Sequence, residues 1–264
     1  MPKTFVNGMN LYYEVHGKGE PLVLIAGFSC DSSFWKTILS GLEKHFHVLI
    51  FDNRGVGQSS CPGYDYTAED MAEDTLQLIH KLDFGKPHLI GHSLGGAIAQ
   101  VIAHGHPEKV SKVILSNTLI KLNKVSEAQQ IFMKHARRNN AAIELLSEAI
   151  IPWLFSNDFL AKSANVDRFV KLQVKNLYPQ SCDSFEHQLK ALLDFDSTTW
   201  YKNILTPTLV IGGEDDILCP HDSKTLGHGI PKAKFINLPR LAHLPNVEKP
   251  AEYIKIVVDF LKNS

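Results

Sequence analysis

The chain has 264 residues, of which 44% are hydrophobic, and its 27 basic and 28 acidic residues give a formal net charge of −1 at pH 7. A chain of this length can bury a large core, as one α/β domain with an insertion or as two small domains. The balanced charge argues against the basic surface that nucleic acids and anionic membranes attract. We therefore expect a small-molecule substrate, no nucleic-acid or membrane partner, and a monomer or homodimer.

The four cysteines lie far apart in the sequence, at Cys30, Cys61, Cys182 and Cys219. This spacing fits neither a disulfide framework nor a zinc site, and it favours a reducing compartment. The N-terminal residues lack the apolar core of a signal peptide, and no apolar run is long enough to cross a bilayer. We expect a cytoplasmic protein that uses no metal and no cofactor.

The first half of the chain alternates between short apolar runs and helical stretches. Two β-rich runs flank Asn7-Gly8, a strong turn signal, and predict a hairpin. Four runs without polar alternation predict parallel strands buried on both faces: residues 21–28, 46–52, 86–92 and 110–117. Helices are predicted at 32–42, 67–82 and 94–104, the second opening with a capping-box-like Thr67 and Asp70.

The alternation stops near Leu119, and residues 120–200 have an almost wholly helical pattern with aromatic residues among charges. It then resumes with strands at 206–213 and 233–239, a helix after His221, and a last helix from about Pro250 to Lys262. This order predicts a mostly parallel central sheet flanked by helices. We expect a core domain of residues 1–119 and 201–264, with residues 120–200 forming a helical cap over one sheet edge.

The segment Gly91-His92-Ser93-Leu94-Gly95 matches the G-x-S-x-G elbow, in which a serine sits on a tight turn between a strand and a helix. The turn strains the serine backbone and exposes its hydroxyl, and the helix N-terminus favours developing negative charge. The alternative is a Gly-rich turn with a polar residue at its tip. The apolar run before Ser93 and the helical run after it favour a nucleophile.

A serine hydroxyl becomes a good nucleophile when a histidine takes its proton. His243 lies in a polar loop between the last predicted strand and the last helix, from which it can reach the strand ends. His92 adjoins the serine but is expected to point away from it. His104 and His106 form an H-x-H pair at a helix end, which we interpret as a C-terminal cap and loop rather than a metal site.

A carboxylate should orient the histidine, and it should follow the strand at 206–213. Glu214, Asp215 and Asp216 stand there in a row, and at least one of them is a solvated loop charge. Two backbone N–H groups should bind the oxyanion. We nominate the N–H groups of Leu94, which follows the serine, and of Phe28, in the loop after the apolar run PLVLIAG. The ring of Phe28 would also shield the pocket.

Six segments, in this order, resemble the α/β-hydrolase fold superfamily: AGFSCDSSFW, FDNRGVGQSS, GHSLGGAIAQ, HPEKVSKVIL, TPTLVIGGEDDILCP and AHLPNVEKP. The chain looks most like the small, capped esterase and lactonase branch that includes 3-oxoadipate enol-lactonases. The resemblance covers nearly the whole chain outside residues 120–200.

The resemblance implies Ser93 as nucleophile, His243 as base and Asp216 as acid, with Asp215 in reserve. It implies the N–H groups of Phe28 and Leu94 as the oxyanion hole. It also makes Arg54 a charge that stabilises the fold. Many relatives carry His-Gly before the oxyanion residue, where this chain has Ala26-Gly27.

We therefore expect a serine hydrolase that cleaves small carboxylic esters or lactones through an acyl-enzyme. The same triad would serve a C–C bond hydrolase, a perhydrolase or an acyltransferase, and some proteins of this fold are ligand-binding receptors. Haloalkane dehalogenation is disfavoured, because in this fold it needs aspartate where Ser93 stands.

The predicted cap offers two groups of candidate pocket residues. Phe132, Trp153 and Phe155 are candidates for an apolar pocket, although aromatic residues at helical spacing are more often core. Lys134, Arg137 and Arg138 form either a carboxylate-binding group or, as we favour, a solvated helix face.

Overall fold

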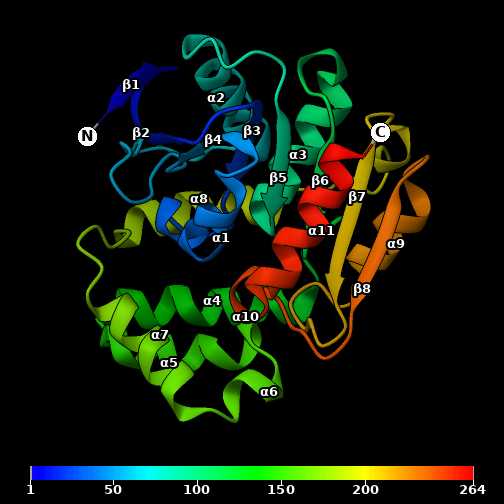
Figure 1. The fold of residues 1–264 in the computed structure, drawn as a ribbon. Coiled ribbons are helices and arrows are strands. Elements are labelled where there is room, and N and C mark those ends of the chain that lie inside the picture. The colour runs from blue at the N-terminus through cyan, green and yellow to red at the C-terminus, as the bar shows by residue number, and fades with distance from the viewer. Residues whose placement is uncertain (1, 264) are drawn as a thin grey trace.

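The computed structural model describes residues 2–263, which form an eight-stranded sheet between helices (Figure 1). The strand order is β1-β2-β4-β3-β5-β6-β7-β8. β1 and β2 are antiparallel to their neighbours, and every pair from β4 to β8 is parallel. The strands are β1 (Lys3–Val6), β2 (Met9–His16), β3 (Glu20–Ile25), β4 (Phe46–Phe51), β5 (His88–His92), β6 (Val113–Ser116), β7 (Thr208–Gly213) and β8 (Lys234–Leu238). The predicted fold class is confirmed.

The strands lack polar alternation because both faces of the sheet are covered. In β3, Val23 and Ile25 belong to one apolar core and Leu22 and Leu24 to another. The first core also holds residues of α2 (Ala68–Lys81), α3 (Leu94–Gly105) and α9 (Asp222–Gly229). The second holds residues of α1 (Lys36–Leu42) and α11 (Pro250–Lys262). Successive strand residues therefore serve opposite cores.

Local signals in the sequence are matched by local structure. Asn7 and Gly8 have φ values of 44° and 81° and connect β1 to β2, as a tight hairpin turn requires. Thr67 and Asp70 form a reciprocal capping box at the start of α2. The Arg54 side chain, only 5% exposed, binds Asp74 on α2 through Nε, at 2.6 Å. That buried ion pair fits the stabilising role expected of Arg54.

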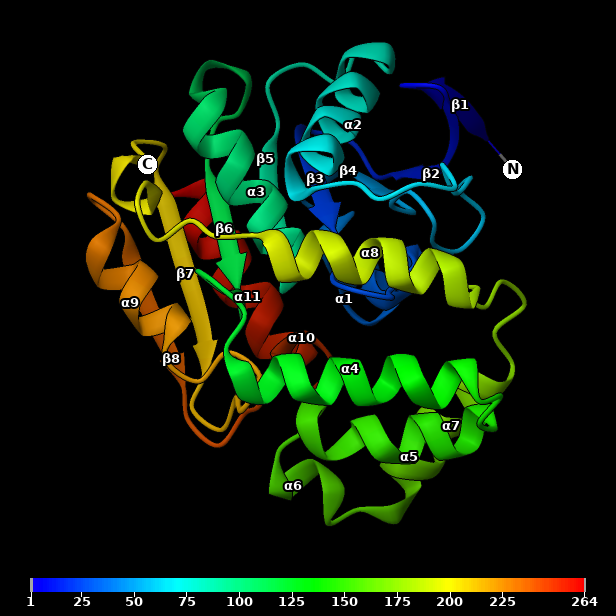
Figure 2. The same ribbon diagram turned by 180° about the vertical axis from the view of Figure 1, so that it is seen from behind.

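The chain between β6 and β7 forms a separate layer of helices, which we call the α4–α8 layer (Figure 2). It consists of α4 (Lys124–Arg138), α5 (Ile143–Leu154), α6 (Asn157–Leu160), α7 (Ser163–Val174) and α8 (Cys182–Asp194). The arrows of β5, β6 and β7 point toward this layer (Figure 1). It therefore covers the carboxyl ends of the parallel strands, where open α/β sheets bind their ligands. The division into core and cap domains stays a prediction.

None of the described helices has both the length and the apolar character that crossing a membrane requires.

Candidate active site

Ser93 lies on the turn between β5 and α3, with φ 53° and ψ −121°. A positive φ is unfavourable for a residue with a side chain, so neighbouring groups must hold this turn. The Ser93 N–H donates to the carbonyl of Ser116 at 3.1 Å, and its own carbonyl accepts from Thr118 Oγ1 at 2.6 Å. The end of β6 thus fixes the strained serine.

The glycines around Ser93 are required by close packing. A Cβ on Gly91 would overlap the carbonyl of Gly95, and a Cβ on Gly95 would overlap the carbonyl of Ile25 in β3. A Cβ on Gly96 would collide with the side chain of Thr118. The three glycines therefore let α3 start directly against the sheet.

Asp216 and His243 form a buried pair at the ends of β7 and β8. The His243 Nδ1 lies 2.9 Å and 3.1 Å from the two carboxylate oxygens, and both residues are 3% exposed. The carboxylate also accepts from Asn117 Nδ2 at 3.0 Å and from the N–H groups of Leu218 and Cys219 at 3.0 and 3.1 Å. Burial opposes its ionisation, but the charge of His243 and these donors outweigh burial and hold the pKa of Asp216 below its usual value.

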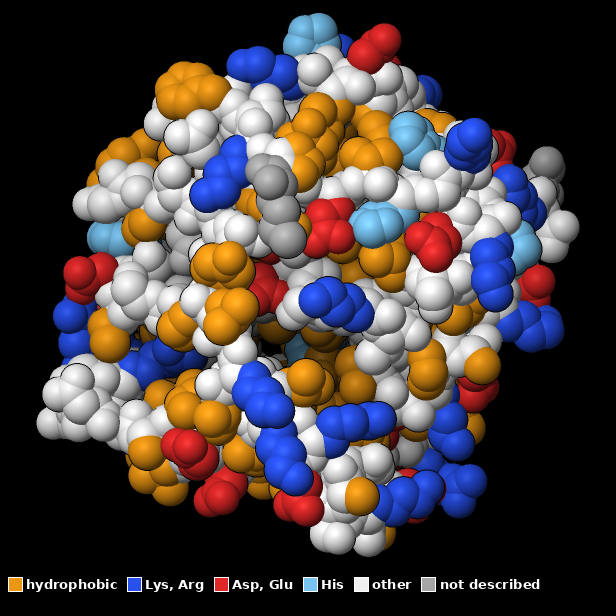
Figure 3. All heavy atoms as spheres, turned by 60° about the vertical axis from the view of Figure 1, so that its left-hand side comes forward, with side chains coloured by type: hydrophobic (Ala, Val, Ile, Leu, Met, Phe, Trp, Pro, Cys, Tyr) orange, Lys and Arg blue, Asp and Glu red, His pale blue; other side chains and the backbone are white. Residues whose placement is uncertain are grey.

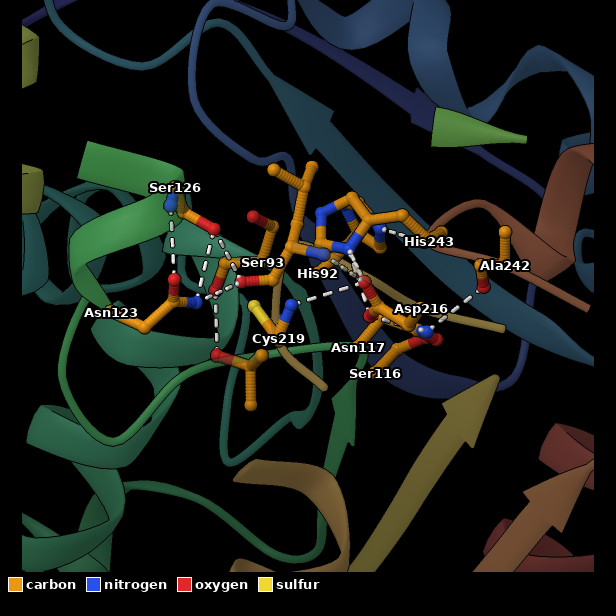
Figure 4. A network of polar contacts seen from close by, with 12 residues as sticks. His92, Ser93, Ser116, Asn117, Asn123, Ser126, Asp216, Cys219, Ala242 and His243 are labelled. Atoms are coloured by element: carbon orange, nitrogen blue, oxygen red, sulfur yellow. Dashed lines mark hydrogen bonds and ion pairs between the residues drawn. The ribbon is translucent and has the colours of Figure 1, made fainter. Parts of the chain in front are cut away.

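The structure thus places Asp216 against the histidine, whereas Glu214 and Asp215 are exposed. With Nδ1 occupied by the carboxylate, Nε2 is the ring nitrogen of His243 left for proton transfer. Ser93 lies in the same cluster of side chains (Figure 4). The assignment of nucleophile, base and acid remains a prediction, and the geometry is compatible with it.

His92 has a structural contact with His243 that the sequence did not reveal. Its Nε2 donates to the backbone carbonyl of His243 at 2.8 Å, and the two rings pack edge to face at 4.8 Å. Burial, followed by the charge of His243, lowers the pKa of His92 to about 3. The ring is therefore neutral at pH 7 and supports the loop that carries His243.

The nominated oxyanion donors lie beside Ser93. Over residues 2–263, neither the Phe28 nor the Leu94 N–H donates to a protein acceptor. A Cβ on Gly27 would lie 3.0 Å from the Cβ of Ser93, so the backbone leading to Phe28 passes close to the serine. Next in the chain, the Ser29 N–H donates to an amide side chain of α8 at 2.8 Å. Both N–H groups are thus free of protein acceptors, and their role as oxyanion donors stays a prediction.

Asn117, directly after β6, connects Asp216 to the loop that carries His243, and the sequence analysis missed it. It is fully buried with φ 45°. Its Nδ2 donates both to Asp216 and, at 3.1 Å, to the carbonyl of Ala242, which precedes His243 (Figure 4). The only sequence signal was an asparagine directly after a buried strand.

The α4–α8 layer is attached to both loops that carry the pair. At the start of α4, Asn123 Nδ2 and Ser126 Oγ donate to the carbonyl of Leu218, at 2.8 and 2.9 Å. Before α6, the Ser156 hydroxyl binds the Glu248 carboxylate, which belongs to the short helix α10 (Pro245–Glu248).

The same Glu248 carboxylate accepts from the N–H of Ala242, the residue before His243, at 3.2 Å. One polar chain therefore leads from α4 to the Asp216 loop, and another leads from the start of α6 to the His243 loop.

The three aromatic residues predicted to line a pocket differ from one another in burial. Phe132 is 59% exposed, because the buried side of α4 is formed by Ser126, Gln129, Gln130 and Met133. Phe132 is therefore not part of the core, and its role as a pocket residue stays a prediction. Phe155 is 3% exposed and stacks on Phe159 with ring centroids 4.1 Å apart, which makes it core. Trp153 is partly buried and packs against the main core.

One group of described residues has ligand atoms close enough for a metal ion, namely Asp216, Cys219 and His243. Its chemistry does not suit a metal. The His243 Nδ1 is already bonded to the carboxylate, and burial raises the pKa of the Cys219 thiol well above its usual value, so the thiol stays protonated.

The surface is hollowed between the sheet domain, at the top of Figure 3, and the α4–α8 layer below it. Lys and Arg side chains lie along the lower rim of this hollow.

Comparison with known proteins agrees with this geometry. A family model described as alpha/beta hydrolase fold matches residues 20–250. The chain is 30% identical over 263 residues to "Putative carbamate hydrolase RutD" of Pantoea ananatis, covering 96% of this chain and 93% of that protein. The enol-lactonase of Burkholderia xenovorans superimposes with a TM-score of 0.89 at 27% identity, covering 99% of this chain and 100% of its own. The metagenomic hydrolase MGS-M2 has a TM-score of 0.90 at 20% identity, which supports the fold alone. The chain is a hydrolase that belongs to the α/β-hydrolase fold family.

Proposed function

We propose that the protein hydrolyses small carboxylic esters or lactones through an acyl-enzyme on Ser93. The observation that carries this proposal is the buried His243–Asp216 pair, 2.9 Å apart, beside a serine held at φ 53°. The enol-lactonase likeness supports a lactone or ester carbonyl as the reacting group.

In this mechanism Ser93 Oγ attacks the carbonyl carbon while His243 Nε2 takes its proton. Asp216 keeps the imidazole oriented and stabilises its charged form. The N–H groups of Phe28 and Leu94 bind the oxyanion, and each such donor contributes about 3–4 kcal/mol in serine hydrolases. The protonated histidine then gives its proton to the leaving alcohol. Water, activated by the same nitrogen, releases the acid and regenerates the serine.

The test is hydrolysis of p-nitrophenyl esters from acetate to dodecanoate. Ser93→Ala should lower kcat by about 10⁴-fold or more, with a similar loss for Asp216→Asn. Asp215→Asn is the matched control, because Asp215 is exposed and should be replaceable without loss. Full activity in Ser93→Ala would refute the mechanism, and equal losses in both aspartate variants would refute the choice of acid.

The name of the Pantoea ananatis relative favours a second candidate, a carbamate carbonyl, which the same residues would attack. The two candidates are separated by kcat/KM for p-nitrophenyl N-methylcarbamate and p-nitrophenyl acetate. A higher value for the carbamate would replace the ester proposal.

A further inference from the structure

Arg137 is a partly buried cation in the α4–α8 layer, and none of the described acidic residues forms an ion pair with it. It follows Met133 by one helical turn on the inner side of α4, and burial lowers the pKa of its guanidinium. Its Nη1 makes one long hydrogen bond, 3.5 Å, to the carbonyl of Gln180. Its Nε is buried and has no partner among the described residues. Arg137 thus differs from the solvated helix face that we expected in that its Nε is shielded from solvent.

The neighbouring cations differ from Arg137. Arg138 is exposed and binds the carboxylates of Asp183 and Glu186, and Lys134 lies 3.7 Å from Glu186. These acids are thus already paired with other cations. A buried charge without a partner is unfavourable, and a bound anion would relieve that cost.

A chain of ring contacts connects Arg137 to the oxyanion loop. The guanidinium carbon lies 4.5 Å from the ring centroid of Phe185, on α8. That ring packs edge-on against Phe28, with centroids 4.7 Å apart. Two ring contacts therefore connect the guanidinium of Arg137 to Phe28, the nominated oxyanion residue.

A second unpaired donor lies next to the same loop. Gln188 is fully buried, and its Oε1 accepts from the Ser29 N–H at 2.8 Å and from Gln180 Nε2 at 3.1 Å. Its Nε2 has no partner among residues 2–263. Because Arg137 and Gln188 both contact Gln180, the two unpaired donors lie on either side of one residue.

We propose that Arg137 and the Gln188 amide bind a carboxylate of the substrate, at a distance from the carbonyl that reacts. The planar guanidinium suits a carboxylate because it can donate two parallel hydrogen bonds. The preferred substrate is then an ester or lactone that also bears a free carboxylate. This inference rests on the proposed hydrolase function.

The experiment compares matched anionic and neutral esters. For an acyl-side carboxylate the pair is p-nitrophenyl hydrogen glutarate and p-nitrophenyl valerate; for the alcohol side it is 4-acetoxybenzoate and its methyl ester. Arg137→Gln should raise KM for the anionic member of one pair by about 10- to 100-fold and leave the neutral esters unchanged. Arg138→Gln is the control and should change neither. Arg137→Lys, which keeps the charge but not the planar fork, should give an intermediate KM.

A binding measurement without turnover separates the subsite from the chemistry. Glutarate should raise the Tm of the wild type and of Arg138→Gln, but not that of Arg137→Gln. If Arg137→Gln matches Arg138→Gln on every ester and in the glutarate shift, the subsite is refuted while Ser93-dependent turnover stands. If no ester is hydrolysed but the glutarate shift requires Arg137, the subsite stands and the proposed function fails.

Discussion

Removing the side-chain amide of Asn117 should test whether this buried residue positions Asp216 relative to His243. Asn117→Gly deletes the hydrogen bonds to Asp216 and Ala242 yet tolerates φ 45°. A bond to a charged group contributes about 1.5–3 kcal/mol and a neutral one about 0.5–1.5 kcal/mol, so the free energy of unfolding should fall by about 2–4.5 kcal/mol. Asn117→Ala should lose about 1–2 kcal/mol more, because alanine is strained at positive φ.

The catalytic consequence distinguishes positioning from plain stability. Below the melting range, Asn117→Gly should lower kcat on p-nitrophenyl esters about 10-fold or more with little change in KM, since Asp216 loses orientation rather than substrate contact. Asn117→Asp would put two carboxylates against each other and raise the pKa of the pair. The acid limb of its kcat/KM profile should move to higher pH. A wild-type kcat in Asn117→Gly, with only stability reduced, would show that our reasoning about positioning is wrong.

Two further predictions concern stability. The pKa of His92 falls from 6.5 to about 3 on folding, so protonation favours the unfolded chain and stability is lost as the pH falls from 6.5 toward 3. His92→Gln, which keeps an N–H for the carbonyl of His243, should lose less Tm between pH 7 and pH 4.5 than the wild type; equal losses would contradict this assignment. Arg54→Met should lower the free energy of unfolding by about 3–5 kcal/mol, because it leaves the buried Asp74 carboxylate without a cation and with the Asn7 amide as its remaining side-chain donor. Lys121→Met, at an exposed ion pair, should leave the denaturant midpoint unchanged, and comparable losses in both variants would argue against the role of burial.

The elements that were predicted best are those whose structure depends on residues nearby in the sequence. The turn at Ser93 and the helix that follows it depend on neighbouring glycines, and α11 begins at Pro250 and ends at Lys262 as expected. The exposure of Phe132 was not predicted, because aromatic spacing does not reveal which side of a helix is buried.

Residues whose roles depend on distant partners could not be predicted. Asp216 and Asp215 are neighbours in the same loop, and only the fold brings one of them to His243. The role of Asn117 depends on Asp216, which is remote in the sequence. The role proposed for Arg137 depends on the lack of a partner for its Nε among the described residues.

The two attachments of the helical layer have a consequence for protein engineering. Asn123 and Ser126 bind the loop of the acid, and Ser156 binds the carboxylate that steadies the loop of the base. Residues 120–200 therefore cannot be exchanged as a unit, because a foreign layer grafted at the ends of β6 and β7 would remove the side chains that support the Asp216 and His243 loops. A chimaera that changes specificity should retain the first turn of α4 and the serine before α6, and vary only the positions between them.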